Sequence, residues 1–172
     1  MKKPEKLYHG SNIKTEGALF PIMLHTTDDH RHVDAAVFAT ERKDIASLFM
    51  LSPDILSSIG FEQDIAYICI WGTLKEYLAH DTKGYLYILP TESFRKVGKE
   101  YEWQSYDPVV PAEVITFSSV IQGMMECGAQ VYFINNNDDF DYIVENKNNR
   151  SDLLCTRISE NERLNIHFKK FI

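Results

Sequence analysis

The chain has 172 residues, of which 44% are hydrophobic and 25% charged, and its formal net charge is −7 at pH 7. This length and composition predict one globular domain, residues 1–172, with a sizeable core. The acidic balance argues against a broad nucleic-acid-binding surface. Because we find no N-terminal apolar targeting segment and no apolar run long enough to cross a membrane, we expect a cytoplasmic protein with no membrane partner.

Short apolar or alternating runs predict strands at residues 6–9, 35–39, 65–71, 84–89, 101–106, 113–117, 130–134 and 164–168. Helical periodicity and capping residues predict helices after Thr40, at 74–80, from Ser118 or Ser119 to about Glu126, and around 139–145. Polar segments at 25–34 and 52–63 predict loops. Many short strands with few helices between them indicate an α+β fold rather than a doubly wound parallel sheet. Neither a Gly-rich dinucleotide motif nor a P-loop motif is present in the sequence.

The cysteines and histidines form no recognised metal-binding pattern. The three cysteines are far apart and include no CxxC pair, and Cys69, in its apolar run, fits a small core residue. Residues 25–32 are rich in histidine and aspartate, and His30 and His32 are the side chains that a metal would use there. Since no recognised ligand spacing supports that site, we expect a solvated loop and no metal cofactor.

The first segment whose residues could form part of a functional site is Leu7-Tyr8-His9-Gly10-Ser11. Its apolar run delivers a histidine to a strand end, and the glycine leaves the backbone open to a ligand. It resembles the opening motif of the ADP-ribosyltransferase superfamily, especially the poly(ADP-ribose) polymerase-like (His-Tyr-Glu) branch. The resemblance implies that His9 binds an NAD ribose hydroxyl, that the Gly10 backbone holds the nicotinamide amide, and that Ser11 lines the same pocket. Taken alone, the tripeptide also fits a strand-end histidine with a local hydrogen bond.

The second segment is a strand ending at Ala39, followed by a helix that reaches Phe49. It resembles the family's aromatic strand and helix, where two tyrosines with ten residues between them sandwich the nicotinamide ring. Phe38 and Phe49 have that spacing, and stacking needs only a flat ring. Alignment on the alanines instead would put Val37 and Leu48 at these positions. Phe38 and Phe49 as ordinary core residues are the alternative.

The third segment runs from Glu100 to Asp107. Carboxylates two residues apart on a strand point to the same face. The family's catalytic glutamate lies on such a strand, and a Tyr-Asp pair follows four residues later, as Tyr106 and Asp107 follow Glu102 here. The resemblance implies that Glu102 is catalytic, with Glu100 as the second choice because it would complete the Glu-x-Glu of arginine-modifying relatives. A solvated acidic strand edge is the alternative.

The resemblance implies two small sheets packed face to face, with NAD in the cleft between them and helices at the periphery. Cleavage of the nicotinamide–ribose bond passes through an oxocarbenium-like state, as in glycoside hydrolysis, and a carboxylate stabilises the charge that develops. The implied enzyme uses NAD as a substrate, needs no metal, and transfers ADP-ribose to an unidentified acceptor, protein or nucleic acid, with release of nicotinamide.

Two other functions stay open. An RNA 2′-phosphotransferase resembles this chain at His9, but that family depends on arginines, and Arg31, Arg42 and Arg95 are scattered in an acidic chain. An NAD- or ADP-ribose-binding module without transfer activity fits the replacement of both stacking tyrosines, whereas retention of His9 and Glu102 favours an enzyme.

Overall fold

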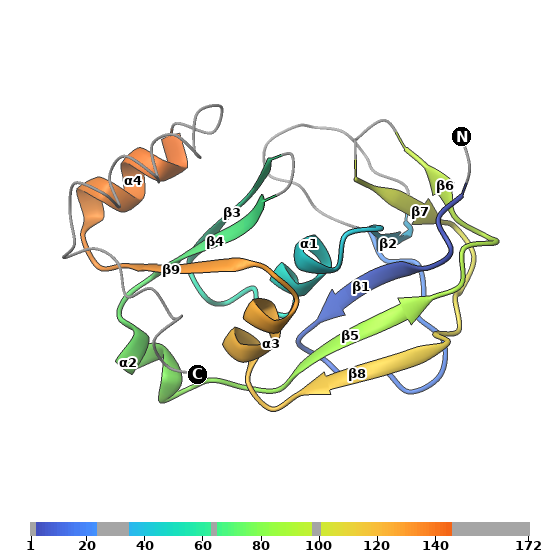
Figure 1. The fold of residues 1–172 in the computed structure, drawn as a ribbon, viewed down its shortest axis with the longest axis horizontal. Helices are drawn as coiled ribbons and strands as arrows, with labels where there is room; N and C mark the ends of the chain where they lie inside the picture. Colours follow the sequence, from blue (N-terminus) through green and yellow to red (C-terminus); the bar gives the residue numbers. More distant parts are fainter. Residues whose placement is uncertain (1–2, 24–34, 63–64, 98–100, 146–172) are drawn as a thin grey trace.

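The computed structural model describes residues 3–23, 35–62, 65–97 and 101–145 (Figure 1). The strands are β1 (Leu7–Ser11), β2 (Val37–Ala39), β3 (Ser57–Glu62), β4 (Ile65–Trp71), β5 (Gly84–Leu89), β6 (Arg95–Lys96), β7 (Trp103–Ser105), β8 (Glu113–Phe117) and β9 (Gln130–Ile134). The helices are α1 (Lys43–Leu48), α2 (Leu74–Leu78), α3 (Val120–Glu126) and α4 (Asn137–Glu145). This mixture of short strands and helices is the α+β class that the sequence predicted.

The strands form three three-stranded sheets, in the orders β1-β5-β8, β2-β7-β6 and β3-β4-β9. The first two are antiparallel, and the third is mixed because β4 and β9 run parallel. The family resemblance implied two small sheets. The described chain has three, and an antiparallel bridge between Tyr8 and Thr40 joins the first to the second.

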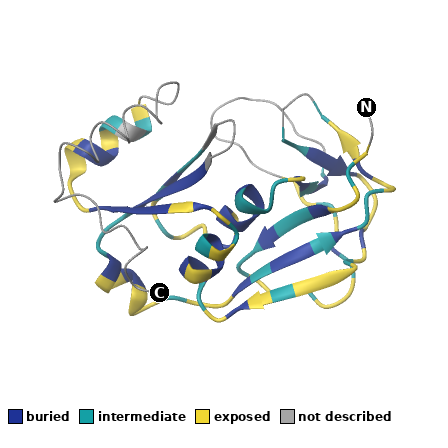
Figure 2. Cartoon of the chain, in the orientation of Figure 1, coloured by how far each residue is buried: buried dark blue, intermediate teal, exposed yellow. Residues whose placement is uncertain are grey.

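Helices α1 and α3 lie between the β3-β4-β9 sheet and the β1-β5-β8 sheet (Figure 1). Buried positions concentrate on these helices and on the strands that face them (Figure 2). The largest core cluster accordingly combines residues of α1, α3, β4, β5 and β9. The packing of the helices therefore holds the two sheets together.

Strand β4 is buried on both faces, which explains why its sequence is apolar without interruption. Ala66, Ile68 and Ile70 face the main core, whereas Tyr67 and Cys69 belong to a second cluster with β9 and α4. The sequence of a strand that is buried on both faces is hydrophobic at successive positions rather than at alternate ones. The predicted bounds of this strand and the role of Cys69 as a core residue are confirmed.

The prediction of a loop at 52–63 was wrong for the second half of this segment, where β3 pairs with β4. Gly60 lies against the ring of Tyr67, so that an added Cβ would come within 2.1 Å of the ring. A glycine inside a strand can therefore mark a close approach rather than a loop. The short strand β6 was not predicted, and the strand predicted at 164–168 and the loop at 25–34 lie outside the described residues.

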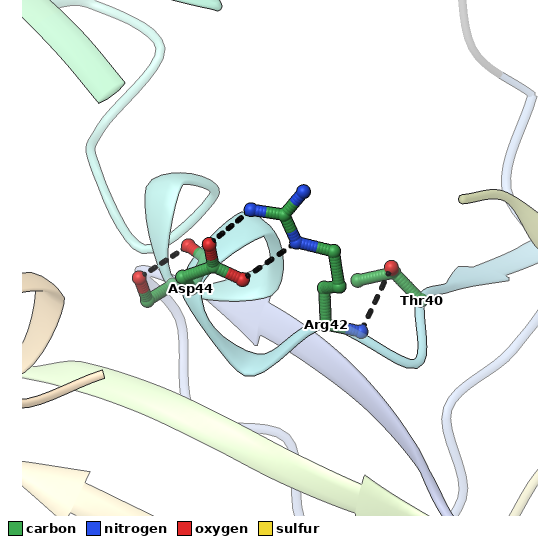
Figure 3. A network of polar contacts seen from close by, with 4 residues as sticks. Thr40, Arg42 and Asp44 are labelled. Atoms are coloured by element: carbon green, nitrogen blue, oxygen red, sulfur yellow. Dashed lines mark hydrogen bonds and ion pairs between the residues drawn. The ribbon is translucent and has the colours of Figure 1, made fainter. Parts of the chain in front are cut away.

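The first helix begins two residues later than predicted, because Arg42 and not Thr40 is its N-cap. Thr40 instead exchanges backbone hydrogen bonds with Tyr8, while its hydroxyl oxygen accepts one from the Arg42 N–H at 3.2 Å. Arg42 then pairs through both Nε and Nη2 with the Asp44 carboxylate, and Ser47 donates to the Asp44 carbonyl oxygen (Figure 3). This polar network fixes the turn from β2 into α1.

In the part of the chain that the structure describes, the helices are all too short or too polar to traverse a bilayer.

Candidate functional site

His9 lies on β1 and contacts the neighbouring strand β2. Its Nδ1 is 2.7 Å from the carbonyl oxygen of Phe38. Because a carbonyl oxygen can only accept, Nδ1 carries the proton of the neutral ring and Nε2 is left as an acceptor. Burial lowers the pKa of His9, and the hydrogen bond to Phe38 opposes this only in part. At neutral pH the ring is therefore uncharged and able to accept a hydrogen bond from a hydroxyl group.

Gly10 presents its backbone at the same strand edge as Tyr8. Tyr8 exchanges both backbone hydrogen bonds with Thr40, at 2.7 and 3.0 Å, so its N–H and C=O point away from β5. Backbone groups alternate along an antiparallel pair, so those of Gly10, two residues on and opposite Leu86, point to this edge as well. Because the bridge is antiparallel, Gly10 lies on the Phe38 side of Thr40, and the backbone hydrogen bonds described between β1 and this segment are those of Tyr8 with Thr40.

The face of Gly10 is not open in the way that the sequence suggested. A Cβ at this position would lie 1.9 Å from the carbonyl oxygen of Ala46 in α1. Glycine is therefore required here by the close approach of helix and strand. Any ligand at Gly10 has to use the strand edge, through the N–H and C=O, rather than the face. Ser11 ends the strand and is partly buried, and its hydroxyl oxygen accepts from the N–H of Ile13.

Glu102 immediately precedes β7, whereas the sequence placed it within the strand. Its Oε1 accepts a hydrogen bond of 2.7 Å from Nε2 of Gln104. Gln104 is only 6% exposed, and its Oε1 accepts from the hydroxyl of Tyr106 at 3.2 Å. The alternating side chains of residues 102, 104 and 106 thus form one hydrogen-bonded row. Glu100, the other predicted catalytic carboxylate, lies outside the described residues.

Strand β2 brings the first and third sequence segments together. Phe38, whose carbonyl oxygen holds His9, is the cross-strand partner of Gln104. Gln104 in turn holds Glu102. Two hydrogen bonds and the backbone pairing of Phe38 with Gln104 therefore link the histidine to the carboxylate, although they are far apart in the sequence.

The two phenylalanines do not share one environment. Phe49 is 53% exposed and lines a groove of about 440 Å³ between the end of α1, Asn12 and the start of β3. Phe38 is partly buried and is not among the residues that line this groove. In the alternative alignment, Leu48 lines the groove but is 1% exposed, while Val37 is 2% exposed in the core. Only the second ring of the predicted pair reaches the groove.

Sequence reasoning missed Gln104 and the contact between Arg42 and Tyr101. The Arg42 guanidinium lies 5.0 Å from the centre of the Tyr101 ring, which connects the start of α1 to the segment entering β7. The alternation Glu-x-Gln-x-Tyr was the available signal for Gln104, since alternate strand residues share a face. No local signal pairs Arg42 with Tyr101.

Among the described residues there is no group of three or more His, Cys, Asp or Glu side chains that could hold a metal ion. His30 and His32 lie outside these residues. Of the arginines considered for phosphate binding, Arg42 is paired with Asp44 and Arg95 is exposed on β6, while Arg31 is not described.

Comparison with family models, with curated proteins and with solved structures finds no match to this chain.

Proposed function

We propose that this protein is an NAD-dependent ADP-ribosyltransferase, which transfers ADP-ribose to a protein or nucleic-acid acceptor and releases nicotinamide. The observation that carries the proposal is the link from His9 to Glu102, which consists of the hydrogen bond of His9 to Phe38, the pairing of Phe38 with Gln104, and the hydrogen bond of Gln104 to Glu102. A neutral histidine acceptor and a carboxylate are the two groups that the proposed reaction uses around the hydroxyls of a single ribose.

In the proposed reaction, the bond between the ribose C1′ and the nicotinamide nitrogen breaks, and nicotinamide leaves with the electron pair. His9 accepts a hydrogen bond from a ribose hydroxyl through Nε2 and thereby orients the sugar. Glu102 accepts from a second hydroxyl and stabilises the positive charge on the ring. The acceptor nucleophile then attacks C1′ and releases its proton to solvent, so no covalent enzyme intermediate is needed.

The surroundings support binding of the leaving group. The amide of nicotinamide can both donate and accept, and the N–H and C=O of Gly10 point to the edge of β1 away from β5, where the described backbone hydrogen bonds are those of Tyr8. Ser11, at the end of the same strand, is available for a further polar contact with the amide. The exposed ring of Phe49 supplies a surface for stacking. Phe38 contributes through its carbonyl oxygen rather than as a second ring of the groove.

The test measures nicotinamide release from NAD by the wild type and by the Glu102→Gln variant, with NAD binding measured separately by calorimetry. We expect the variant to bind NAD but to lose about a hundredfold or more in rate. The matched control is Glu113→Gln, which removes an exposed strand glutamate on β8 and should leave the rate unchanged. If Glu100→Gln loses turnover while Glu102→Gln keeps it, the catalytic carboxylate has been assigned to the wrong residue.

The second candidate is a module that binds NAD or ADP-ribose without transfer. The position of Phe38 outside the groove favours it, because one stacking ring in place of two weakens the hold on nicotinamide. Wild-type protein that binds NAD and releases no nicotinamide, in buffer or with cell extract added as a source of acceptor, would establish the module. Label from NAD entering protein or nucleic acid of that extract would establish transfer and identify the acceptor class.

A further inference from the structure

The amide of Gln104 lies between a carboxylate and a phenol, and its two ends are both occupied. Nε2 donates to Glu102 at 2.7 Å and Oε1 accepts from Tyr106 at 3.2 Å. A glutamine side chain that is 6% exposed needs such partners, because a buried amide without them is costly. The orientation of the amide is also determined, since the opposite one would turn its oxygen toward the negatively charged carboxylate.

Backbone pairing holds Gln104 in place from both sides. It lies in the middle strand of the β2-β7-β6 sheet, opposite Phe38 on one side and Arg95 on the other. The residue that holds the Glu102 carboxylate is therefore also the cross-strand partner of the residue that holds His9.

We infer that Gln104 is the positioning residue of this site, which fixes one carboxylate oxygen of Glu102, while Tyr106 fixes the amide of Gln104. The inference rests on the proposed function of Glu102. Gln104 does not contact the substrate in this arrangement. It acts by preventing the carboxylate from rotating away from the ribose, and a misplacement of about 1 Å in a catalytic group costs about a hundredfold.

The decisive variant is Gln104→Met, which keeps the length of the side chain and removes both hydrogen bonds. We expect kcat for nicotinamide release to fall about ten- to a hundredfold, with KM for NAD within about twofold, because the lost interaction serves the transition state. Tyr106→Phe should give a smaller fall in kcat, since the amide remains next to Glu102. In a Glu102→Gln background, Gln104→Met should add less than about twofold, because the two residues act as one unit.

The chain contains a matched control for this variant. Gln122 on α3 donates from Nε2 to Glu126 at 2.8 Å, in an exposed pair of the same chemical kind. Gln122→Met should leave kcat and KM unchanged. Unchanged kcat in Gln104→Met, or a rise in KM alone, would overturn the inference. A fall in kcat that Gln122→Met reproduces would overturn it as well.

A second readout separates this inference from the proposed function. The side-chain amide resonances of Gln104 in ¹⁵N NMR should move in Glu102→Gln and in Tyr106→Phe, and stay in place in Gln122→Met. If the wild type releases no nicotinamide, the proposed function is refuted, and the resonances alone decide whether Gln104 holds Glu102. Resonances that neither substitution moves would refute the hydrogen-bonded row.

Discussion

The close approach of strand β1 to helix α1 can be tested by Gly10→Ala. The added Cβ would lie 1.9 Å from the Ala46 carbonyl oxygen and 2.9 Å from its carbonyl carbon. These are backbone atoms in the middle of α1, so no side-chain rotation relieves the clash, and the helix must retreat by about 1 Å from β1 in a close-packed interior. Overpacking costs about 1–3 kcal/mol in most cores, and a backbone neighbour puts this site at the upper end, about 3 kcal/mol.

That cost corresponds to a fall of about 6–12 °C in Tm for a domain of this size, measured by circular dichroism or calorimetry. The control is Gly17→Asn. Gly17 has φ 85° and an added Cβ there meets nothing within 4 Å, and asparagine tolerates this left-handed conformation. Gly17→Asn should change the free energy of unfolding by about 0.5 kcal/mol or less. If Gly10→Ala melts within about 2 °C of the wild type, α1 does not lie against β1 as closely as described.

Three further substitutions test separate parts of the structure. Thr73 and Glu76 form a capping box at the start of α2. Thr73→Ala should lower the free energy of unfolding, measured in urea, by about 1 kcal/mol, whereas Thr73→Ser should keep most of that stability. In the unfolded chain His9 is protonated near pH 6.5, whereas burial lowers its pKa in the folded protein. The free energy of unfolding should therefore decrease as the pH falls below about 6.5. His9→Asn should lack this contribution to the pH dependence of stability between pH 5 and 8. A steeper decrease in His9→Asn than in the wild type would contradict the buried neutral ring. Phe49→Ala should raise the Kd for NAD about fivefold, the equivalent of about 1 kcal/mol of stacking, with little change in Tm because the ring is 53% exposed. Phe38→Ala should leave that Kd within about twofold, and the reverse ranking would restore Phe38 as the stacking residue.

Local patterns were sufficient for most of the strands and helices. The bounds predicted for β4, β5, β8 and β9 agree with the structure, because each is a short apolar or alternating run with turn residues beside it. Helix α3 has Ser119, one of the two predicted caps, as its N-cap, and Gly128 follows its end with φ 95°. These signals act over a few residues, so the sequence carries them directly.

Where a segment depends on a distant partner, local patterns failed. Strand β3 has too little apolar character to be identified alone, and its pairing with β4 makes it a strand. Thr40 has the residue type of an N-cap, but its backbone bonds to Tyr8 keep it extended, and the helix starts later. Tertiary hydrogen bonds outweighed a local preference in this case.

The sequence by itself determined which residue types the candidate site contains and the order in which they occur: His9 and Gly10 first, then the aromatic segment, then Glu102. Only the tertiary structure decided how they meet. The Phe38 carbonyl oxygen holds His9, Gln104 links Phe38 to Glu102, and the Ala46 carbonyl oxygen explains the glycine. Each of these contacts joins backbone or side chains from separate elements. No periodicity or cap within a short window records such contacts, because they arise only when the sheets and helices pack together.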